Sequence, residues 1–377
     1  MIRSLTSNCW FYRAVLKNNI GKDLSKIPMP VMMNEPLSML QRLSEDLEYS
    51  HLLDKAAKCT TTHERMCYIA AYTVSSYATT YYRTNKPFNP MLGETYELDL
   101  SQDKSYGWKT IAEQVSHHPP IAAMHTESNE WEMCQQFSMS SKFRGKYLSI
   151  IPTGVSWIRF KKTNEKYSWT KVTTCVNNII IGKLWIDQYG DMVIKSHTTN
   201  DVAKIKFVPY SYFSNTTPRS VVGTVEDGNG NVAYNLNGTW DISMSHSPVN
   251  DPKNITTAWT VNKLPDNADK MYGYGYFACV LNDPQGAVGV APTDSRLRPD
   301  LRALDSQVYD LAEAEKLRLE EKQRTTRKYR EQQGISYTPA WFKPTMDPDT
   351  ERPIHAFTGE YWKQKEAGDW SNSNLIY

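Results

Sequence analysis

Between about residue 90 and residue 290 the chain alternates apolar and polar residues in short runs separated by turn-forming residues. Residues 147–151, 156–160 and 204–209 are examples. Alternation with a period of two indicates half-buried strands, and many short strands in chain order favour an antiparallel meander. So long a meander must curl or close to protect its edges, and a large closed barrel encloses a cavity. We therefore expect an α+β, mainly β fold built on a large, near-closed antiparallel β-barrel.

Hairpin turns are expected where Gly, Asn and Asp interrupt the alternation. These positions are Gly154, Asn164, Gly190, residues 227–230 and residues 237–238.

Helical periodicity flanks the β-rich region on both sides. Residues 35–80 predict helices, with Leu37, Leu40 and Leu43 on one apolar stripe. Residues 301–332 again predict helix, because they are rich in Ala, Glu, Leu, Lys and Arg. The remaining residues, 333–377, are mixed, and we expect them to wrap the outside of the fold.

Composition excludes several classes of protein. The net charge is only +2 for 377 residues, which does not indicate a nucleic-acid partner. The six cysteines include no C-x-x-C pair, which argues against a zinc ribbon or a disulfide scaffold and fits a reducing compartment. No signal peptide or run of 18 apolar residues is present. We expect a cytoplasmic protein that does not span a membrane.

The string Glu113-Gln-Val-Ser-His117-His118-Pro119-Pro120 is the most unusual in the chain. The two prolines exclude a helix here, and the residues before the string predict a strand. His117 and His118 are therefore expected near a strand end. Neighbouring imidazoles suit a metal, an acid–base pair, or a phosphate that accepts both N–H groups.

An enzyme is one alternative, with Glu113, His117, His118 and His125 as a metal-hydrolase cluster. Adjacent residues of a strand point to opposite faces, so the two imidazoles would not chelate one metal. The sequence also contains no H-E-x-x-H, no G-x-S-x-G and no P-loop. We expect no catalysis, no metal and no cofactor.

Residues 113–120 resemble the fingerprint of the oxysterol-binding-protein family of lipid carriers. Similarity to the family's ligand-binding domain extends from about residue 20 to the C-terminus, through residues 86–94, 141–147, 182–187 and 292–300. The resemblance implies that the barrel encloses a lipid tunnel within one ligand-binding domain. Its parts would be a lid at residues 1–30 that includes Leu24 and Ile27, a helical layer and barrel core at 31–300, and a C-terminal helix and wrapping tail at 301–377.

Lys316, Glu320 and Arg324 are spaced by four residues, which places them on one stripe of a helix. Such a stripe is usually a solvated face with weak ion pairs. The resemblance instead implies a phosphoinositide headgroup site formed by the stripe with His117 and His118. Lys316 and Arg324 would pair with phosphate, and Glu320 would accept from inositol hydroxyls.

The resemblance adds Lys86 and Asn89, whose family counterparts reach the glycerol-phosphate part of the headgroup. Arg318, Lys322 and Arg327 lie off the stripe and are expected to face water.

The implied function is lipid transfer: sterol and phosphatidylinositol 4-phosphate would bind in the same tunnel and be exchanged between membranes. The alternatives are a sensor that binds without transporting and a carrier that exchanges phosphatidylserine for the phosphoinositide. We expect peripheral contact with intracellular membranes, at endoplasmic reticulum–Golgi contacts. No pleckstrin-homology domain is expected before residue 20, so the chain would be a short form, a fragment, or dependent on a partner protein for targeting.

Overall fold

The computed structural model describes residues 30–179, 182–211, 217–371 and 373–377. The predicted lid residues Leu24 and Ile27 lie outside the described residues. No helix in the described part of the chain is both long and apolar enough to cross a membrane.

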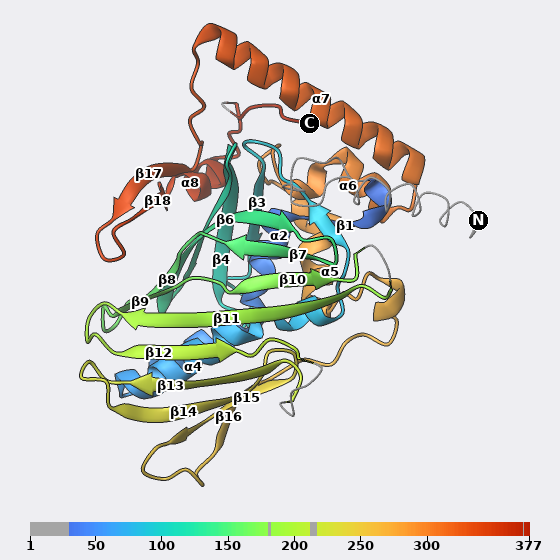
Figure 1. Ribbon diagram of the computed structural model, residues 1–377. Helices are drawn as coiled ribbons and strands as arrows, with labels where there is room; N and C mark the ends of the chain where they lie inside the picture. The colour runs from blue at the N-terminus through green and yellow to red at the C-terminus, as the bar shows by residue number, and fades with distance from the viewer. Residues whose placement is uncertain (1–29, 180–181, 212–216, 372) are drawn as a thin grey trace.

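One antiparallel sheet dominates the described residues and contains fourteen strands (Figure 1). Its strands follow one another in chain order over most of the sheet, as the meander prediction requires. The strands are β3 (Thr95–Asp99), β4 (Trp108–His117), β5 (Pro120–Ser128), β6 (Trp131–Phe143), β7 (Tyr147–Pro152), β8 (Ser156–Phe160), β9 (Lys166–Trp169), β10 (Thr173–Asn177), β11 (Trp185–Ser196), β12 (Val202–Phe207), β13 (Ser220–Glu226), β14 (Val232–Thr239), β15 (Ser243–Pro248) and β16 (Thr256–Thr260).

Part of this sheet closes on itself. The first half of β6 pairs with β8 and its second half with β7. From there β8 pairs with β9, β9 with β11, β11 with β10, and β10 with β7. These six strands form a closed ring, because a long strand can have different partners along its length. The predicted fold class, a large near-closed antiparallel barrel with added helices, is confirmed.

Three of the five expected hairpin turns are wrong. Gly190 lies inside β11, at the point where the partner changes from β10 to β12, and its φ of +126° suits the bend that this change requires. Residues 237–238 lie inside β14, where a Cβ on Gly238 would collide with the backbone of Ser243 in β15. Both positions require glycine although they lie within strands. The sequence signal for a turn does not distinguish such glycines from turn glycines. Gly154 joins β7 to β8, which both pair with β6 and not with each other, so it is not in a hairpin turn. The turns at Asn164 and 227–230 are confirmed.

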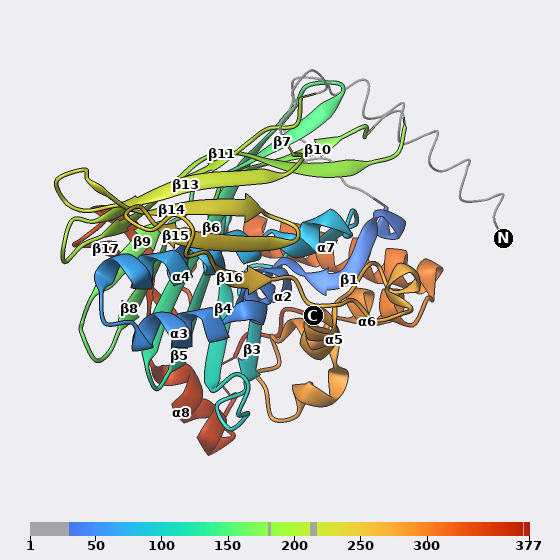
Figure 2. The same ribbon diagram turned by 90° about the horizontal axis from the view of Figure 1, so that it is seen from below.

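The N-terminal helices lie on the concave side of the sheet (Figure 2). They are α2 (Met39–Ser44), η3 (Glu45–Tyr49), α3 (His51–Lys58), α4 (Thr62–Ser75) and η4 (Ala78–Tyr81), after a short η2 (Val31–Met33). The helical prediction for 35–80 is wrong at its start, because Asn34–Ser38 is strand β1, which pairs in parallel with β2 (Lys86–Phe88). Ser38 ends that strand and caps α2 in a capping box with Gln41.

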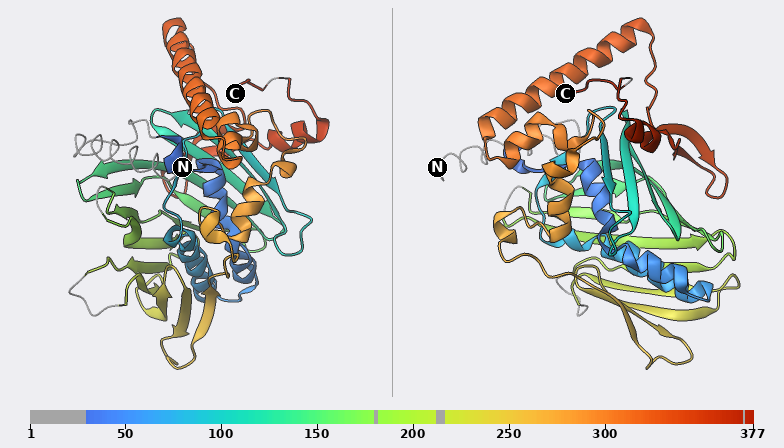
Figure 3. Two further views of the ribbon diagram at one scale, coloured as in Figure 1. Left: turned by 90° about the vertical axis from the view of Figure 1, so that its right-hand side faces the viewer. Right: turned by 180° about the vertical axis from the view of Figure 1, so that it is seen from behind.

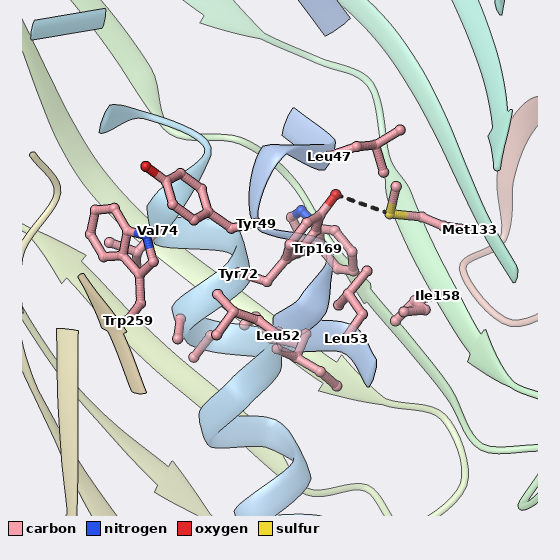
Figure 4. Close-up of a cluster of buried hydrophobic side chains, with 14 of the residues drawn as sticks. Leu47, Tyr49, Leu52, Leu53, Tyr72, Val74, Met133, Ile158, Trp169 and Trp259 are labelled. Carbon is pink, nitrogen blue, oxygen red and sulfur yellow. Dashed lines mark hydrogen bonds between the residues drawn. The ribbon is translucent and has the colours of Figure 1, made fainter. Parts of the chain in front are cut away.

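The largest apolar cluster fills the space between these helices and the sheet. Helix α4 packs across β12–β16, and α3 adds the buried Leu52 and Leu53. Figure 4 shows Tyr72 of α4 among side chains from several strands, with its hydroxyl 3.5 Å from the sulfur of Met133. Trp169 meets the Tyr72 ring edge-on at 6.4 Å. The helices are thus fixed within the curled sheet by large aromatic contacts.

The C-terminal tail packs on the face of β4 and β5 opposite the N-terminal helices. Helix α7 (Tyr309–Gln333) extends along the top of the molecule (Figures 1 and 3), and the tail then forms β17 (Phe342–Asp347), β18 (Arg352–Phe357) and α8 (Glu360–Ala367). Tail residues Trp341, Phe342 and Tyr361 pack on Ile111 and Val115 of β4, so the tail wraps the sheet as expected. The shorter helices between β16 and α7 are η5 (Ala268–Lys270), α5 (Tyr276–Asn282), η6 (Pro284–Ala287), η7 (Ser295–Leu297) and α6 (Pro299–Asp305). Of these, α5 packs against α2 and η3.

The helix expected at 301–332 is broken near its start. Helix α6 ends at Asp305, and Gln307 has a left-handed backbone with φ of 60°. The N–H of Val308 then bonds back to the carbonyl of Ala303, a helix-ending arrangement. The break sets the direction of α7.

Candidate functional site

The two histidines lie at the tip of the β4–β5 hairpin. His117 is the last residue of β4 and pairs with Pro120, and the His118–Pro119 peptide bond is cis. The two rings meet edge-on with centroids 4.6 Å apart. The expectation that they point to opposite faces is wrong, because His118 has already left the strand and lies in the turn.

Helix α7 passes beside this hairpin and contacts it through Gln323. The Gln323 side-chain oxygen accepts from the N–H of Leu92 at 2.8 Å, and its side-chain nitrogen lies 2.8 Å from Nε2 of His117. Gln323 is a site residue that the sequence did not identify. The signal that could have found it is its position three residues after Glu320, which places both on nearly the same face of the helix.

The predicted stripe on α7 is present as a chain of ion pairs. Nζ of Lys316 lies 3.2 Å from Glu320, and Glu320 lies 3.9 Å from Arg324. Arg324 also pairs with Glu321 at 2.9 Å. Lys316 is buried, whereas the Arg324 side chain is about half exposed. The stripe therefore runs from a buried cation to an accessible one.

The loop of Lys86 and Asn89 joins the buried end of this stripe. Lys86 donates from Nζ to the side-chain oxygen of Asn89 at 2.6 Å. Burial and the nearby charge of Lys316 lower the pKa of Lys86 to about 8, an effect that Glu320 opposes. The structure thus brings Lys86 and Asn89 close to Lys316 and Glu320.

Arg298 holds this loop in place, although the sequence did not single it out. It is buried and donates to Glu94 at 2.7 Å, to Asp300 at 2.7 Å and to the backbone carbonyl of Asn89 at 2.9 Å. Two carboxylates balance its buried charge, and its contact with Asn89 fixes the backbone that presents Lys86.

Glu113, which begins the His-His-Pro-Pro string, anchors the segment that follows α7. One of its carboxylate oxygens accepts from the Tyr337 hydroxyl at 3.1 Å and the Ala340 N–H at 2.8 Å, and the other accepts from the Trp341 N–H at 2.9 Å. Burial raises the pKa of Glu113 to about 7, against the effect of these three donors. Its role is to position the chain around the site.

Three cations of α7 were expected to face water, and for Lys322 this expectation is wrong. It donates to the backbone carbonyls of Leu375 and Tyr377 at 3.1 and 2.7 Å, and so ties α7 to the C-terminus. Arg318 and Arg327 are exposed, as expected.

A small internal pocket lies among the ring strands, away from the histidines. It is lined by Leu43, Gln135, Gln136, Phe137, Pro152, Gly154, Ser156 and Lys171. Asp46 accepts from Gln135 at 3.2 Å and pairs with Lys171 at 2.6 Å. The side-chain oxygen of Gln135 is buried and has no hydrogen-bond donor among the described residues. The pocket therefore offers an acceptor in surroundings that are partly apolar and partly polar.

The fold and these sites define a β-barrel-like ligand-binding domain. No group of three potential metal ligands occurs in the part of the chain that the structure describes. The family model described as oxysterol-binding protein matches residues 11–366. The chain belongs to the oxysterol-binding protein family. This family comprises lipid-binding proteins and not enzymes, which confirms the expectation of a non-catalytic protein.

Full-length relatives extend well beyond the region that they share with this chain. The chain is 48% identical over 390 residues to oxysterol-binding protein 2 of Mus musculus, covering 96% of this chain and 42% of that protein. It is 41% identical to oxysterol-binding protein-related protein 1B of Arabidopsis thaliana, covering 97% of this chain and 73% of that protein. The chain spans less than half the length of the mammalian relatives it matches.

Two solved structures are similar over nearly the whole chain. The Osh1 ORD domain in complex with cholesterol has a TM-score of 0.89 at 36% identity, covering 97% of this chain and 90% of that chain. The Osh3 ORD in complex with PI(4)P from Saccharomyces cerevisiae has a TM-score of 0.83 at 32% identity, covering 97% and 95%.

Proposed function

We propose that this domain binds a sterol and phosphatidylinositol 4-phosphate in turn and exchanges them between membranes. The observation that carries the proposal is that three segments distant in the sequence lie close together, one of them on α7. These are the His117–His118 turn, the Lys86–Asn89 loop and the Lys316/Glu320/Arg324 stripe.

The chemistry of this cluster suits a phosphorylated inositol ring. A phosphomonoester carries close to two negative charges near neutral pH. Arg324 and Lys316 supply charge-assisted hydrogen bonds, and the two imidazoles supply N–H donors. Glu320 lies between the two cations, where it can accept from ring hydroxyls. Lys86 and Asn89 lie beside Lys316, which suits contact with the phosphate that joins the ring to glycerol.

The interior of the ring is the proposed place of the second ligand. A sterol is almost wholly apolar and has one hydroxyl, so it needs an apolar space with a single polar contact. The pocket beside Gln135 supplies an unpaired acceptor for such a hydroxyl. Widening this pocket would require movement of the side chains that line it.

Exchange follows if the two lipids share one interior space, because binding of one then excludes the other. The cholesterol complex of Osh1 and the PI(4)P complex of Osh3 support binding of each lipid by this fold, since both folds are similar to this one. The proposal includes a lid at residues 1–30 with Leu24 and Ile27, and a domain divided at residues 30 and 300. It also includes peripheral contact with intracellular membranes in the cytoplasm, with endoplasmic reticulum–Golgi contacts as the site of action.

Transfer between vesicles of defined composition tests the proposal. We would follow sterol and phosphatidylinositol 4-phosphate separately for the wild type, His117→Ala/His118→Ala, and the control His51→Ala, which alters an exposed histidine at the start of α3. The double variant is expected to lose phosphoinositide transfer but still extract sterol. Unchanged movement of both lipids would show that the histidines are structural.

Two further outcomes separate the alternatives. Wild-type protein that binds both lipids but moves neither would be a sensor. Wild-type protein that moves phosphatidylserine in place of sterol, against the same phosphoinositide, would identify a different cargo.

A further inference from the structure

The orientation of the Gln323 side chain can be assigned from its neighbours. A backbone N–H can only donate, so the atom that faces Leu92 N–H at 2.8 Å must be the amide oxygen. The amide nitrogen therefore faces Nε2 of His117 at 2.8 Å. An amide nitrogen can also only donate. Nε2 of His117 must accept this hydrogen bond with its lone pair, and the ring hydrogen must be on Nδ1.

We propose that Gln323 is a positioning residue that holds His117 as the neutral tautomer with its hydrogen on Nδ1, and that this N–H is donated to a phosphate oxygen of the headgroup. The ligand in this proposal rests on the proposed function. The tautomer does not, because it follows from the contacts of Gln323 alone.

The environment of Nδ1 supports a role in binding. This atom is buried and has no hydrogen-bond partner among the described residues. A buried N–H without an acceptor is unfavourable, since it has lost its hydrogen bonds to water. A phosphate oxygen would restore the missing bond, and the bond would be strengthened by the negative charge of the phosphate.

The surrounding groups favour the neutral ring. Burial is the largest factor, followed by His118 at the hairpin tip and Arg327 on α7, and together they lower the pKa of His117 to about 4. A second proton on the His117 ring would also remove the Nε2 lone pair that Gln323 needs. His117 would thus contribute a directed hydrogen bond, while Arg324 and Lys316 contribute the charge.

The tautomer can be measured in the whole chain without lipid. In protein labelled with ¹⁵N at histidine, and assigned with His117→Ala, the imidazole nitrogens report which one carries hydrogen. We expect a protonated Nδ1 and an unprotonated Nε2 for His117 at pH 7. Gln323→Glu, which can accept but not donate, should move the hydrogen to Nε2 or charge the ring. A wild-type ring with its hydrogen on Nε2 would overturn the proposal.

Binding to vesicles that contain phosphatidylinositol 4-phosphate tests the second half. Removal of a bond to a charged group predicts that Gln323→Leu and Gln323→Glu bind about ten- to a hundredfold more weakly, with sterol binding unchanged. Gln333→Glu, at an exposed position of the same helix, is the charge control. If only Gln323→Glu weakens binding, charge repulsion explains the loss and the proposal fails. If His117→Ala/His118→Ala binds normally, the proposed headgroup site itself fails.

Discussion

Glu113 is a buried carboxylate whose ionisation should be visible in the stability of the whole domain. It accepts three hydrogen bonds from the segment after α7, and no cation balances it among the partners that the described residues provide. Its pKa in the folded protein is raised by burial from an ordinary value of 4.5 to about 7. The folded state therefore binds this proton more tightly than the unfolded state does. It follows that this group stabilises the fold as the pH falls from about 7 towards 4.5.

The size of the effect follows from the two pKa values. Between pH 8 and pH 5.5 the free energy of unfolding should rise by about 2 kcal/mol on account of Glu113 alone. Other groups also titrate over this range, so the absolute curve is not diagnostic. Glu113→Gln has nearly the same shape and cannot ionise, so the difference between wild type and variant isolates the contribution of Glu113.

Urea unfolding at several pH values from 5.5 to 8 measures this difference. The stability of the wild type relative to Glu113→Gln should increase by about 2 kcal/mol as the pH is lowered. In the variant an amide nitrogen faces a backbone N–H, which lowers the free energy of unfolding. Because this loss is the same at every pH, it does not affect how the difference between the two proteins changes with pH. Glu130→Gln, at an exposed position, should leave the slope unchanged. Parallel curves for the wild type and Glu113→Gln would refute the reasoning.

Three further outcomes are expected. Because the pKa of Lys86 is lowered to about 8 and a bound phosphate would raise it again, affinity for phosphoinositide vesicles should change little from pH 7 to pH 8, where the phosphate keeps most of its second charge. It should fall above pH 8, but not in Lys86→Arg. Arg298→Met should lower the free energy of unfolding by about 3–5 kcal/mol, since it leaves Glu94 without its buried partner. Gly154→Ala should cost about 1–3 kcal/mol in the same assay, because its Cβ would collide with a neighbouring strand, whereas Gly275→Ala has ordinary clearance and should cost less.

The sequence was informative where a contact leaves a local pattern. Alternation with period two predicted the meander, and the spacing of Lys316, Glu320 and Arg324 predicted a stripe that the ion pairs confirm. It failed where one residue type serves two purposes. Gly190 and Gly238 resemble turn residues, yet the first lies at a change of strand partner and the second permits close strand approach.

Contacts between distant residues left no such pattern. Gln323 and His117 are 206 positions apart, and Glu113 and Trp341 are 228 apart. The position of Gln323 three residues after Glu320 is a weak signal, and the 113–120 string gives no indication of which residues Glu113 contacts. Their roles depend on how α7 and the tail lie against β4, which only the folded arrangement determines.

The way α7 is attached bears on how the two lipids could be told apart. Only Ala312, Lys316 and Leu319 of its 25 residues are buried, so apolar packing does little to fix the helix. Polar contacts also hold it, among them those of Glu313, Lys322 and Gln323. A phosphorylated headgroup would add charged contacts to this weakly packed helix. A ligand that binds only the folded arrangement stabilises that arrangement, so the headgroup would help to hold the helix in place. A sterol inside the ring would meet strands held by continuous ladders. In the proposed exchange both lipids would occupy the barrel interior, and only the phosphorylated lipid would also act on the helix.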